Sequence, residues 1–261
     1  MTVGQWAQEV LALARRWFLL LHRDRLELIF SLAQPPIWFL FLGSAVNRAV
    51  DLRVIGTSDY AAFILGSILA VTAVGFSMNG AMPVLWDKET GYLDKLMAMP
   101  IARSSVILSR FLFQFALGSG QVILVLLAGL AIGVRIASGP LGALAMLAIA
   151  GLLSMAATAA CMALAYRVTS HGTFFAILGF ATLPFIFLSN AFVPLDAMPP
   201  PVAFVAWLNP MTHAVDALRR LVLEGFSMAV LRSVGVLGVF AAASVAAGTY
   251  EFRRHTSRDR H

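Results

Sequence analysis

The sequence predicts an all-α membrane protein with six transmembrane helices. Hydrophobic residues make up 60% of the 261-residue chain and charged residues 12%, whereas soluble domains average roughly 45–50% apolar and about 25% charged residues. Six apolar blocks are long enough to cross the hydrocarbon core, which takes about 20 helical residues. The blocks lack the strict alternation of barrel strands, and backbone groups cannot stay unpaired in lipid, so we expect helices.

An amphipathic helix is expected at residues 1–27, ahead of the first apolar block. Its apolar positions recur at helical spacing, which is typical of a helix lying flat on the membrane surface. The alternative is a helix that packs only on protein. The first apolar block has no cleavage site of small residues, so we do not expect a removable signal peptide. The apolar positions are Val3, Trp6, Val10, Leu13, Trp17 and Leu20.

A single six-span membrane domain is expected over residues 28–261, because no repeat or linker separates a second unit. Of the 19 Lys and Arg residues, 13 fall in the segments on the same side of the membrane as the N-terminus and six in the segments on the other side. The positive-inside rule therefore places both termini in the cytoplasm, as an even number of spans requires. The predicted spans are 28–46, 60–84, 106–134, 141–166, 173–193 and 228–250.

Residues 194–227, between the last two predicted spans, are too rich in proline for a seventh span and too apolar for a free loop. We expect two short helices that dip into the outer leaflet or lie along it. The second would follow Pro210, with Val215, Leu218 and Val222 on one side. Irregular backbone at membrane depth requires shielding, so this segment should cover another part of the domain.

The sequence excludes several classes of function. Basic residues form no stripe interleaved with aromatic residues, which argues against nucleic-acid binding. Cys161 is the only cysteine, and no histidine pairs with it or a carboxylate at ligand spacing, so no metal, cofactor or catalytic residue is predicted. The chain has neither a GxSxG motif nor a GxxxxGK[ST] motif. It is therefore not expected to be an enzyme, and any ATP would be hydrolysed by another chain.

The charged segment, residues 86–103, reads WDKETGYLDKLMAMPIAR. A solvated turn is the simplest interpretation, but the apolar residues in it indicate that it docks on a partner. If residues 88–98 form a helix, Tyr92, Leu96 and Met99 lie on one side, and Pro100 ends the helix because it disfavours αR backbone at the residue before it. The expected partner is a cytoplasmic protein that supplies energy.

Two motifs carry a family resemblance. The run ETGYLDKLMAMPIAR resembles the cytoplasmic coupling loop of ABC type-2 transporter permeases, especially daunorubicin-resistance exporters, with its E-x-G-x-x-D-x-L-x-x-x-P-x-x-R arrangement. Residues 183–219 resemble the C-terminal signature of the same family. The first match falls on Glu89, Gly91, Asp94, Leu96, Pro100 and Arg103. The second falls on Pro184, Phe187, Leu188, Ser189, Pro194, Met198, Pro199, Asn209, Pro210, Asp216 and Arg219.

The resemblance implies the permease subunit of an ABC exporter in a bacterial inner membrane, moving hydrophobic or amphipathic compounds such as drugs, antibiotics or lipid-like molecules. The permease would pair with a second copy, or a homologous permease, and with two copies of a separate ATPase that binds ATP and Mg. The charged segment would be the coupling helix, seated in an ATPase cleft near its Q-loop. Its coupling residues would be Glu89, Gly91, Tyr92, Asp94, Leu96, Pro100 and Arg103.

Alternatives remain open from the sequence. A related exporter of polysaccharides or lipid-linked glycans would need more polar and aromatic groups along its path. An ion-coupled carrier would need ionisable side chains deep in the bilayer, and no Asp, Glu or Lys lies in the middle of a block. A membrane anchor or sensor would bind a partner without moving anything.

A substrate path should be mostly apolar with a few hydrogen-bonding groups. The polar groups nominated for it could equally serve helix–helix hydrogen bonds. The pair Gly129 and Gly133 forms a GxxxG that could contact a second copy, although glycine is common in membrane helices. The path candidates are Gln34, Trp38, Asn79, Phe185, Phe187, Ser189 and Asn190, and the outer helices would be marked by Asn209, Pro210, Asp216 and Arg219.

Overall fold

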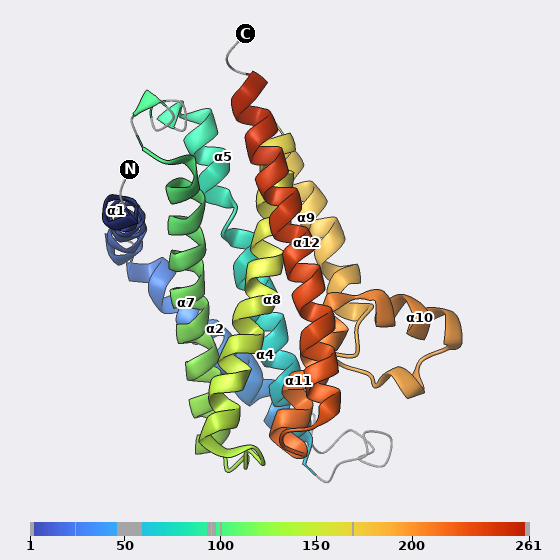
Figure 1. The fold of residues 1–261 in the computed structure, drawn as a ribbon. Coiled ribbons are helices and arrows are strands. Elements are labelled where there is room, and N and C mark those ends of the chain that lie inside the picture. Colours follow the sequence, from blue (N-terminus) through green and yellow to red (C-terminus); the bar gives the residue numbers. More distant parts are fainter. Residues whose placement is uncertain are drawn as a thin grey trace.

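The computed structural model describes residues 3–23, 25–45, 59–92, 95, 98, 99, 101–168 and 170–258. Within these ranges all regular secondary structure is helical, as the sequence predicts. The helices form an elongated bundle, and the start of α1 and the end of α12 lie toward the same end of it, the upper end in Figure 1.

The chain begins with two helices that meet at a sharp bend. Helices α1 (Val3–Arg23) and α2 (Arg25–Ala45) are inclined by 80° to one another. Two ring contacts hold α1 against the side of α7: Trp17 and Phe18 lie 6.5 and 5.0 Å from Phe113, measured between ring centroids.

Four helices are long and apolar enough to span a membrane, and α1 with α2 would add a fifth if the bent pair is one span. Helix α4 is the central one, with 83% of its apolar window buried, against 22% for α12. Helix α9 has only 17 residues, shorter than the 173–193 span predicted from the sequence. The four are α4 (Tyr60–Asn79), α7 (Arg103–Ala131), α8 (Gly139–Arg167) and α12 (Met228–Arg258), and α9 is His171–Phe187.

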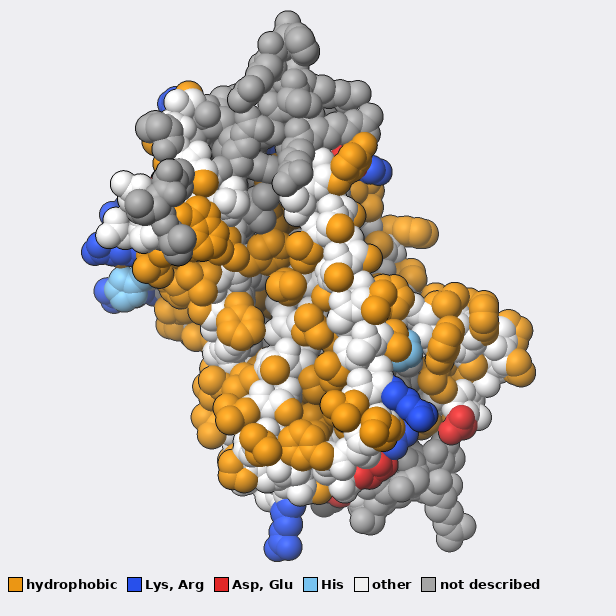
Figure 2. Space-filling view, in the orientation of Figure 1, with side chains coloured by type: hydrophobic (Ala, Val, Ile, Leu, Met, Phe, Trp, Pro, Cys, Tyr) orange, Lys and Arg blue, Asp and Glu red, His pale blue; other side chains and the backbone are white. Residues whose placement is uncertain are grey.

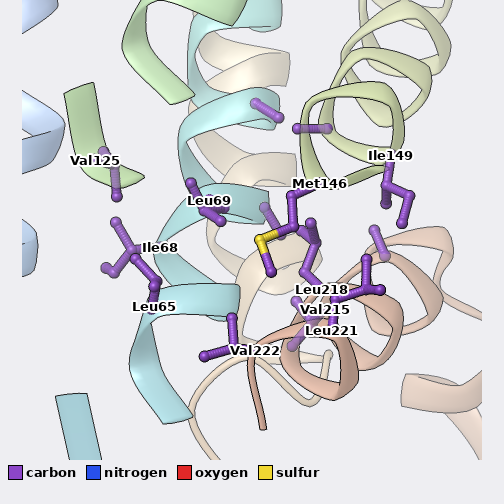
Figure 3. Packing of buried hydrophobic residues seen from close by; sticks show 14 of the residues in the cluster. Leu65, Ile68, Leu69, Val125, Met146, Ile149, Val215, Leu218, Leu221 and Val222 are labelled. Atoms are coloured by element: carbon purple, nitrogen blue, oxygen red, sulfur yellow. The ribbon is translucent and has the colours of Figure 1, made fainter. Parts of the chain in front are cut away.

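The main hydrophobic core lies between α4, α7, α8 and α11 (Pro210–Leu223). Figure 3 shows Leu69 of α4 near Met146 of α8 and Leu218 of α11, whereas Leu65 lies on the side of α4 that faces α7. All four side chains are fully buried. Because lipid is as apolar as these side chains, van der Waals packing rather than exclusion of water holds this part together.

Two glycines allow helix backbones to approach closely. A Cβ on Gly66 of α4 would lie 2.7 Å from the backbone nitrogen of Arg219 on α11, and a Cβ on Gly248 of α12 would lie 3.0 Å from the carbonyl oxygen of Ala159 on α8. Any larger side chain would collide with backbone atoms at Gly66. The sequence therefore fixes the α4–α11 distance through this residue.

The GxxxG pair does not form an outward helix face. Gly129 is buried, and a Cβ there would lie 3.2 Å from Leu65 Cδ2 and 3.7 Å from Phe39 Cε1 of the same chain. Gly133 lies beyond the end of α7, in the left-handed region at φ +92°. Gly129 thus packs α7 on α4 and α2 and Gly133 makes a turn, so contacts within one chain account for both glycines.

Two helices of different character occupy the segment after α9. Helix α10 (Pro200–Leu208) projects away from the bundle (Figure 1), and its surface is largely hydrophobic (Figure 2). Helix α11 instead buries one whole side, including Val215, Leu218 and Val222, against α4 and α12. It is thus part of the core rather than a helix lying along the membrane surface.

Candidate functional site

The end of α5 (Met82–Glu89) carries three consecutive charged residues, Asp87, Lys88 and Glu89, which we call the α5 anchor. Asp87 Oδ2 accepts a hydrogen bond from Arg110 of α7 at 2.5 Å, and its Oδ1 accepts one from Arg16 of α1 at 3.4 Å. Asp87 and Arg110 are only 5% and 6% exposed. Buried charges require such pairing, because an unpaired charge in an apolar interior costs several kcal/mol.

Aromatic rings help to hold the two guanidinium groups on one carboxylate. Arg110 lies over the Trp17 ring at 4.2 Å, and Arg16 lies over the rings of Trp17 and Tyr92 at 4.7 and 4.0 Å. A cation over an aromatic face is stabilised by the negative potential of that face. Tyr92, one of the predicted coupling residues, is therefore tied to α1.

Lys88 binds the C-terminal end of α8. Its Nζ donates hydrogen bonds to the carbonyl oxygens of Ala165, Tyr166 and Val168 at 3.1–3.3 Å. The last carbonyls of a helix lack intrahelical partners and carry the negative end of the helix dipole. A lysine at this position satisfies them and fixes α5 to α8.

Glu89, another predicted coupling residue, joins the start of α9. Its Oε1 lies 2.5 Å from His171 Nδ1, the first residue of that helix. The His171 ring also lies 6.1 Å from the ring of Trp86, measured between centroids. The α5 anchor thus contacts four other helices: α1, α7, α8 and α9.

Helix α1 supplies the cap for α7. The residue before α7 is Ala102, which has no side chain that can cap it. Glu9 Oε2 instead accepts hydrogen bonds from the Ala102 backbone nitrogen at 3.1 Å and from Ser105 Oγ at 2.9 Å. Trp6 Nε1 donates to Ser104 Oγ at 3.0 Å. A carboxylate near a helix N-terminus is stabilised by the helix dipole, so α1 is bound directly to the helix that follows the charged segment.

The charged segment is not one continuous helix. Helix α5 ends at Glu89, and Gly91 follows at φ +66°, a conformation that glycine adopts without strain. Tyr92, Lys95 and Ala98 are again helical. Asp94, Leu96 and Pro100 lie outside the described residues, and so does the side chain of Arg103, which begins α7. Trp86 and Met99 expose 62% and 47% of their surface.

Two of the four predicted outer residues, Asn209 and Pro210, lie at the N-terminus of α11. Asn209 Oδ1 accepts a hydrogen bond from the Met211 backbone nitrogen, and its Nδ2 donates to the carbonyl oxygens of Phe185 and Leu188 at the end of α9. Pro210 follows as the first residue of α11, where its missing N–H costs nothing.

Arg219 and Asp216 bind elements on either side of α11. Arg219 donates to Ser67 Oγ of α4 at 3.0 Å and to the Asn190 carbonyl oxygen at 2.9 Å. Asp216 Oδ2 accepts hydrogen bonds from Arg220 and from Ser233 of α12, each at 3.3 Å. These residues have structural partners within the chain.

The predicted path residues do not converge on one pocket. Trp38 and Phe187 are 52% and 62% exposed, whereas Ser189 and Asn190 are buried. The Ser189 hydroxyl donates to the Ile186 carbonyl oxygen, so it closes the end of α9. Gln34 is exposed, Phe185 is partly buried and contacts the main core, and the side chain of Asn79 lies outside the described part of the chain.

Sequence reasoning did not identify Asp87, Lys88, Arg110 and Arg16 as partners. Arg110 lies about one turn inside the predicted 106–134 span, close enough to its end for an arginine to snorkel to the interface. A signal was present, because an arginine within a span requires a counter-charge, and Asp87 is a carboxylate at the end of the preceding span.

Residues 8–223 match the family model described as ABC-2 type transporter. The chain belongs to the ABC-2 type transporter family. Both motif regions, 89–103 and 183–219, lie inside the matched range. The ABC-2 assignment makes the chain a multi-pass membrane protein and the membrane component of a transport permease.

Relatives of this ABC-2 permease agree with the family assignment. The protein named as transport permease ycf38 in Porphyra purpurea is 34% identical over 81% of this chain and 73% of its own length. The protein named as multidrug ABC transporter permease YbhR in Escherichia coli is 26% identical over 75% of this chain and 53% of its own length. Nodulation protein J of Rhizobium leguminosarum is 25% identical over 95% of each chain.

Proposed function

We propose that this ABC-2 chain is the permease subunit of an ATP-driven exporter in a bacterial inner membrane, with both termini in the cytoplasm. A separate ATPase docks on the charged segment, binds ATP and Mg, and supplies the energy. The cargo is hydrophobic or amphipathic, such as a drug, an antibiotic or a lipid-like compound. The relative named as a multidrug permease supports this class of cargo.

The α5 anchor is the observation that carries this proposal. A docking element can transmit force only if it is bound firmly to the helices that must move. Asp87, Lys88 and Glu89 bind α7, α8 and α9, respectively, while the neighbouring Trp86 is left exposed. The segment thus combines a free outer surface with strong inner attachments, as expected of a coupling element rather than a solvated turn.

Transmission would begin at the exposed surface of the charged segment and reach the spans through short polar contacts. Pushing on Trp86 and Met99 loads α5 and the start of α7 together, since Arg110 and Asp87 join these helices. Glu9 extends the same load to α1. The spans would therefore tilt as a group rather than one at a time.

A second copy of the permease would complete the conduit. Helix α9 buries one of its 17 residues, Phe174, and exposes Phe180 by 82% and Phe187 by 62%. Trp207 of the projecting α10 is also exposed. We propose that this apolar α9–α10 surface faces the second copy, with Gln34, Trp38, Phe185 and Phe187 on or near the path.

Co-purification tests the ATPase partnership. The tagged chain is extracted in detergent from its native host, and the proteins that accompany it are identified by mass spectrometry. We expect an ABC ATPase in stoichiometric amount. The charged segment is tested with Leu96→Asp, which should abolish ATPase binding and export at unchanged membrane insertion, and with Leu96→Met, which should retain both. Full ATP-driven export by Leu96→Asp would contradict the coupling assignment.

The energy source is tested in vesicles that contain the co-purified complex. Export should stop when ATP is depleted and continue when the proton gradient is collapsed, and the permease reconstituted alone should transport nothing. Gradient-driven uptake by the permease alone would instead identify an ion-coupled carrier. Transport of lipid-linked sugars, with no export of apolar compounds, would identify the glycan exporter.

A further inference from the structure

A pocket opens between α7 and α8, beside α1, in the half of the bundle that carries the α5 anchor. Its volume is about 280 Å³. The two long helices that form it run side by side, and α1 lies against the upper half of α7 (Figure 1). We call it the α7–α8 pocket. It is lined by Val10, Leu108, Phe111, Leu112, Gln114, Phe115, Gly151, Ser154, Met155 and Thr158.

Gly151 lets the Phe115 ring of α7 pack directly on the backbone of α8 at the pocket wall. A Cβ at this position would lie 2.4 Å from Cε2 of Phe115, so any larger residue would push that ring into the pocket or out of it. At the mouth, Leu108, Leu112 and Met155 are each 39% exposed. The pocket therefore opens sideways, on the surfaces of two helices that span the membrane.

The depth of the pocket corresponds to one leaflet. Leu108 and Phe115 are seven residues apart on α7, which corresponds to about 10 Å along the helix axis. One half of the hydrocarbon core is about 15 Å thick. Because Leu108 lies close to the start of α7, the pocket extends from the membrane surface on the α5 side toward the midplane. Its surroundings there are acyl chains rather than water.

Most polar groups in the lining already have partners. Gln114 Nε2 donates to the Phe76 carbonyl oxygen, and Ser154 Oγ shares a hydrogen bond with Ser77 Oγ. The Thr158 hydroxyl is buried and has no hydrogen-bond partner among the described residues. Its oxygen is fully buried and does not reach the pocket surface, so the wall offered to an occupant is apolar.

From these observations we propose that the α7–α8 pocket binds one acyl chain of a phospholipid from the leaflet on the α5 side. The walls are apolar, and the volume lies just below the roughly 300–1,000 Å³ of sites for drug-sized ligands. A single chain fits such a slot better than a bulky cargo molecule. The site is separate from the proposed transport path, and its test requires neither the ATPase nor transport.

Photolabelling of the full-length chain in lipid nanodiscs tests this proposal. The probe is phosphatidylethanolamine with a diazirine on one acyl chain, and labelled residues are located by mass spectrometry. We expect residues 108–115 and 151–158 to be labelled more strongly than the residues around Val239 of α12, which is exposed on the helix surface. In Gly151→Leu this labelling should fall about tenfold, equivalent to ~1.4 kcal/mol of binding free energy.

Gly235→Leu on α12 is the matched control, because a Cβ there meets no atom within 4 Å, and it should label like the wild type. If Gly151→Leu does not elute as a folded protein on size exclusion, Met155→Trp closes the mouth from the lipid side and should give the same loss. Thr158→Val should also label like the wild type, because the Thr158 oxygen does not reach the pocket surface. Equal labelling of α7 and α12, or unchanged labelling in Gly151→Leu and Met155→Trp, would overturn the proposal. Cross-links from the pocket to a second copy would also overturn it.

Discussion

The Asp87 carboxylate of α5 and the Arg110 guanidinium of α7 form a buried ion pair at 2.5 Å, and Arg16 of α1 approaches the same carboxylate. Nearly all of the charged segment, residues 86–103, lies between Asp87 and Arg110 in the sequence, so their ion pair holds the two ends of the segment together. A force on this segment should therefore be transmitted to both α5 and α7.

Asp87→Ala should lower the free energy of unfolding by about 3–5 kcal/mol, because it leaves buried Arg110 without a counter-charge. Thermal unfolding in detergent measures the loss. Arg220→Ala is the control: its contacts with Asp216 and Glu224 are half-exposed pairs one turn apart on α11, worth under about 1 kcal/mol. Equal losses in the two variants would show that Asp87 does not neutralise a buried charge.

Lys88→Met should loosen the last turn of α8, since three carbonyl oxygens lose the ammonium that binds them. The expected cost is about 1–3 kcal/mol. Hydrogen exchange of the backbone amides in that turn should become faster. Lys95→Met removes the same charge from an exposed position and should leave exchange in α8 unchanged. Protection equal to that of the wild type in Lys88→Met would refute a capping role.

Gly66→Ala should destabilise the chain by about 1–3 kcal/mol, because the new Cβ would overlap the backbone of Arg219 and force α4 and α11 apart. Gly75→Ala on the same helix meets no atom within 4 Å and should be neutral or stabilising by up to about 1 kcal/mol. Thermal unfolding of the two variants side by side gives the difference. A tolerated alanine at residue 66 would mean that the helices are not in backbone contact.

Asn209→Ala should cost about 1–3 kcal/mol, because it removes both the cap of α11 and the donor to the end of α9. Asn209→Ser keeps an acceptor for the cap but cannot reach the α9 carbonyls. We therefore expect unfolding temperatures in the order Asn, Ser, Ala, from highest to lowest. Wild-type stability in both variants would argue that α9 is held by other contacts.

The helical, membrane-spanning character of the chain could be predicted from sequence because it depends on local composition. The end of α9 could not. The predicted span continues to residue 193, but the helix ends at Phe187, since the Ser189 hydroxyl and the Asn209 amide take carbonyls of its last turn. One of these two residues comes from a distant part of the chain, which no window of local hydropathy includes.

The candidate site was predicted in part. Composition drew attention to the charged segment, and the motif selected Glu89 and Gly91. The partners of the α5 anchor could not be foreseen, because Arg16 and Ala165 are 71 and 77 residues from Asp87 and Lys88. The GxxxG spacing likewise could not reveal that Gly129 faces Leu65 and Phe39 of its own chain.

The backbone contact at Gly66 has a geometric consequence for how α4 and α11 can move. The backbones of α4 and α11 are in contact there and Arg219 donates a hydrogen bond to Ser67, so an inclination of α4 should carry α11 with it. A rod of 20 residues is about 30 Å long, and a 10° inclination displaces its far end by about 5 Å. A movement of α4 would therefore reach α11, which lies at the opposite end of the bundle from α5 (Figure 1).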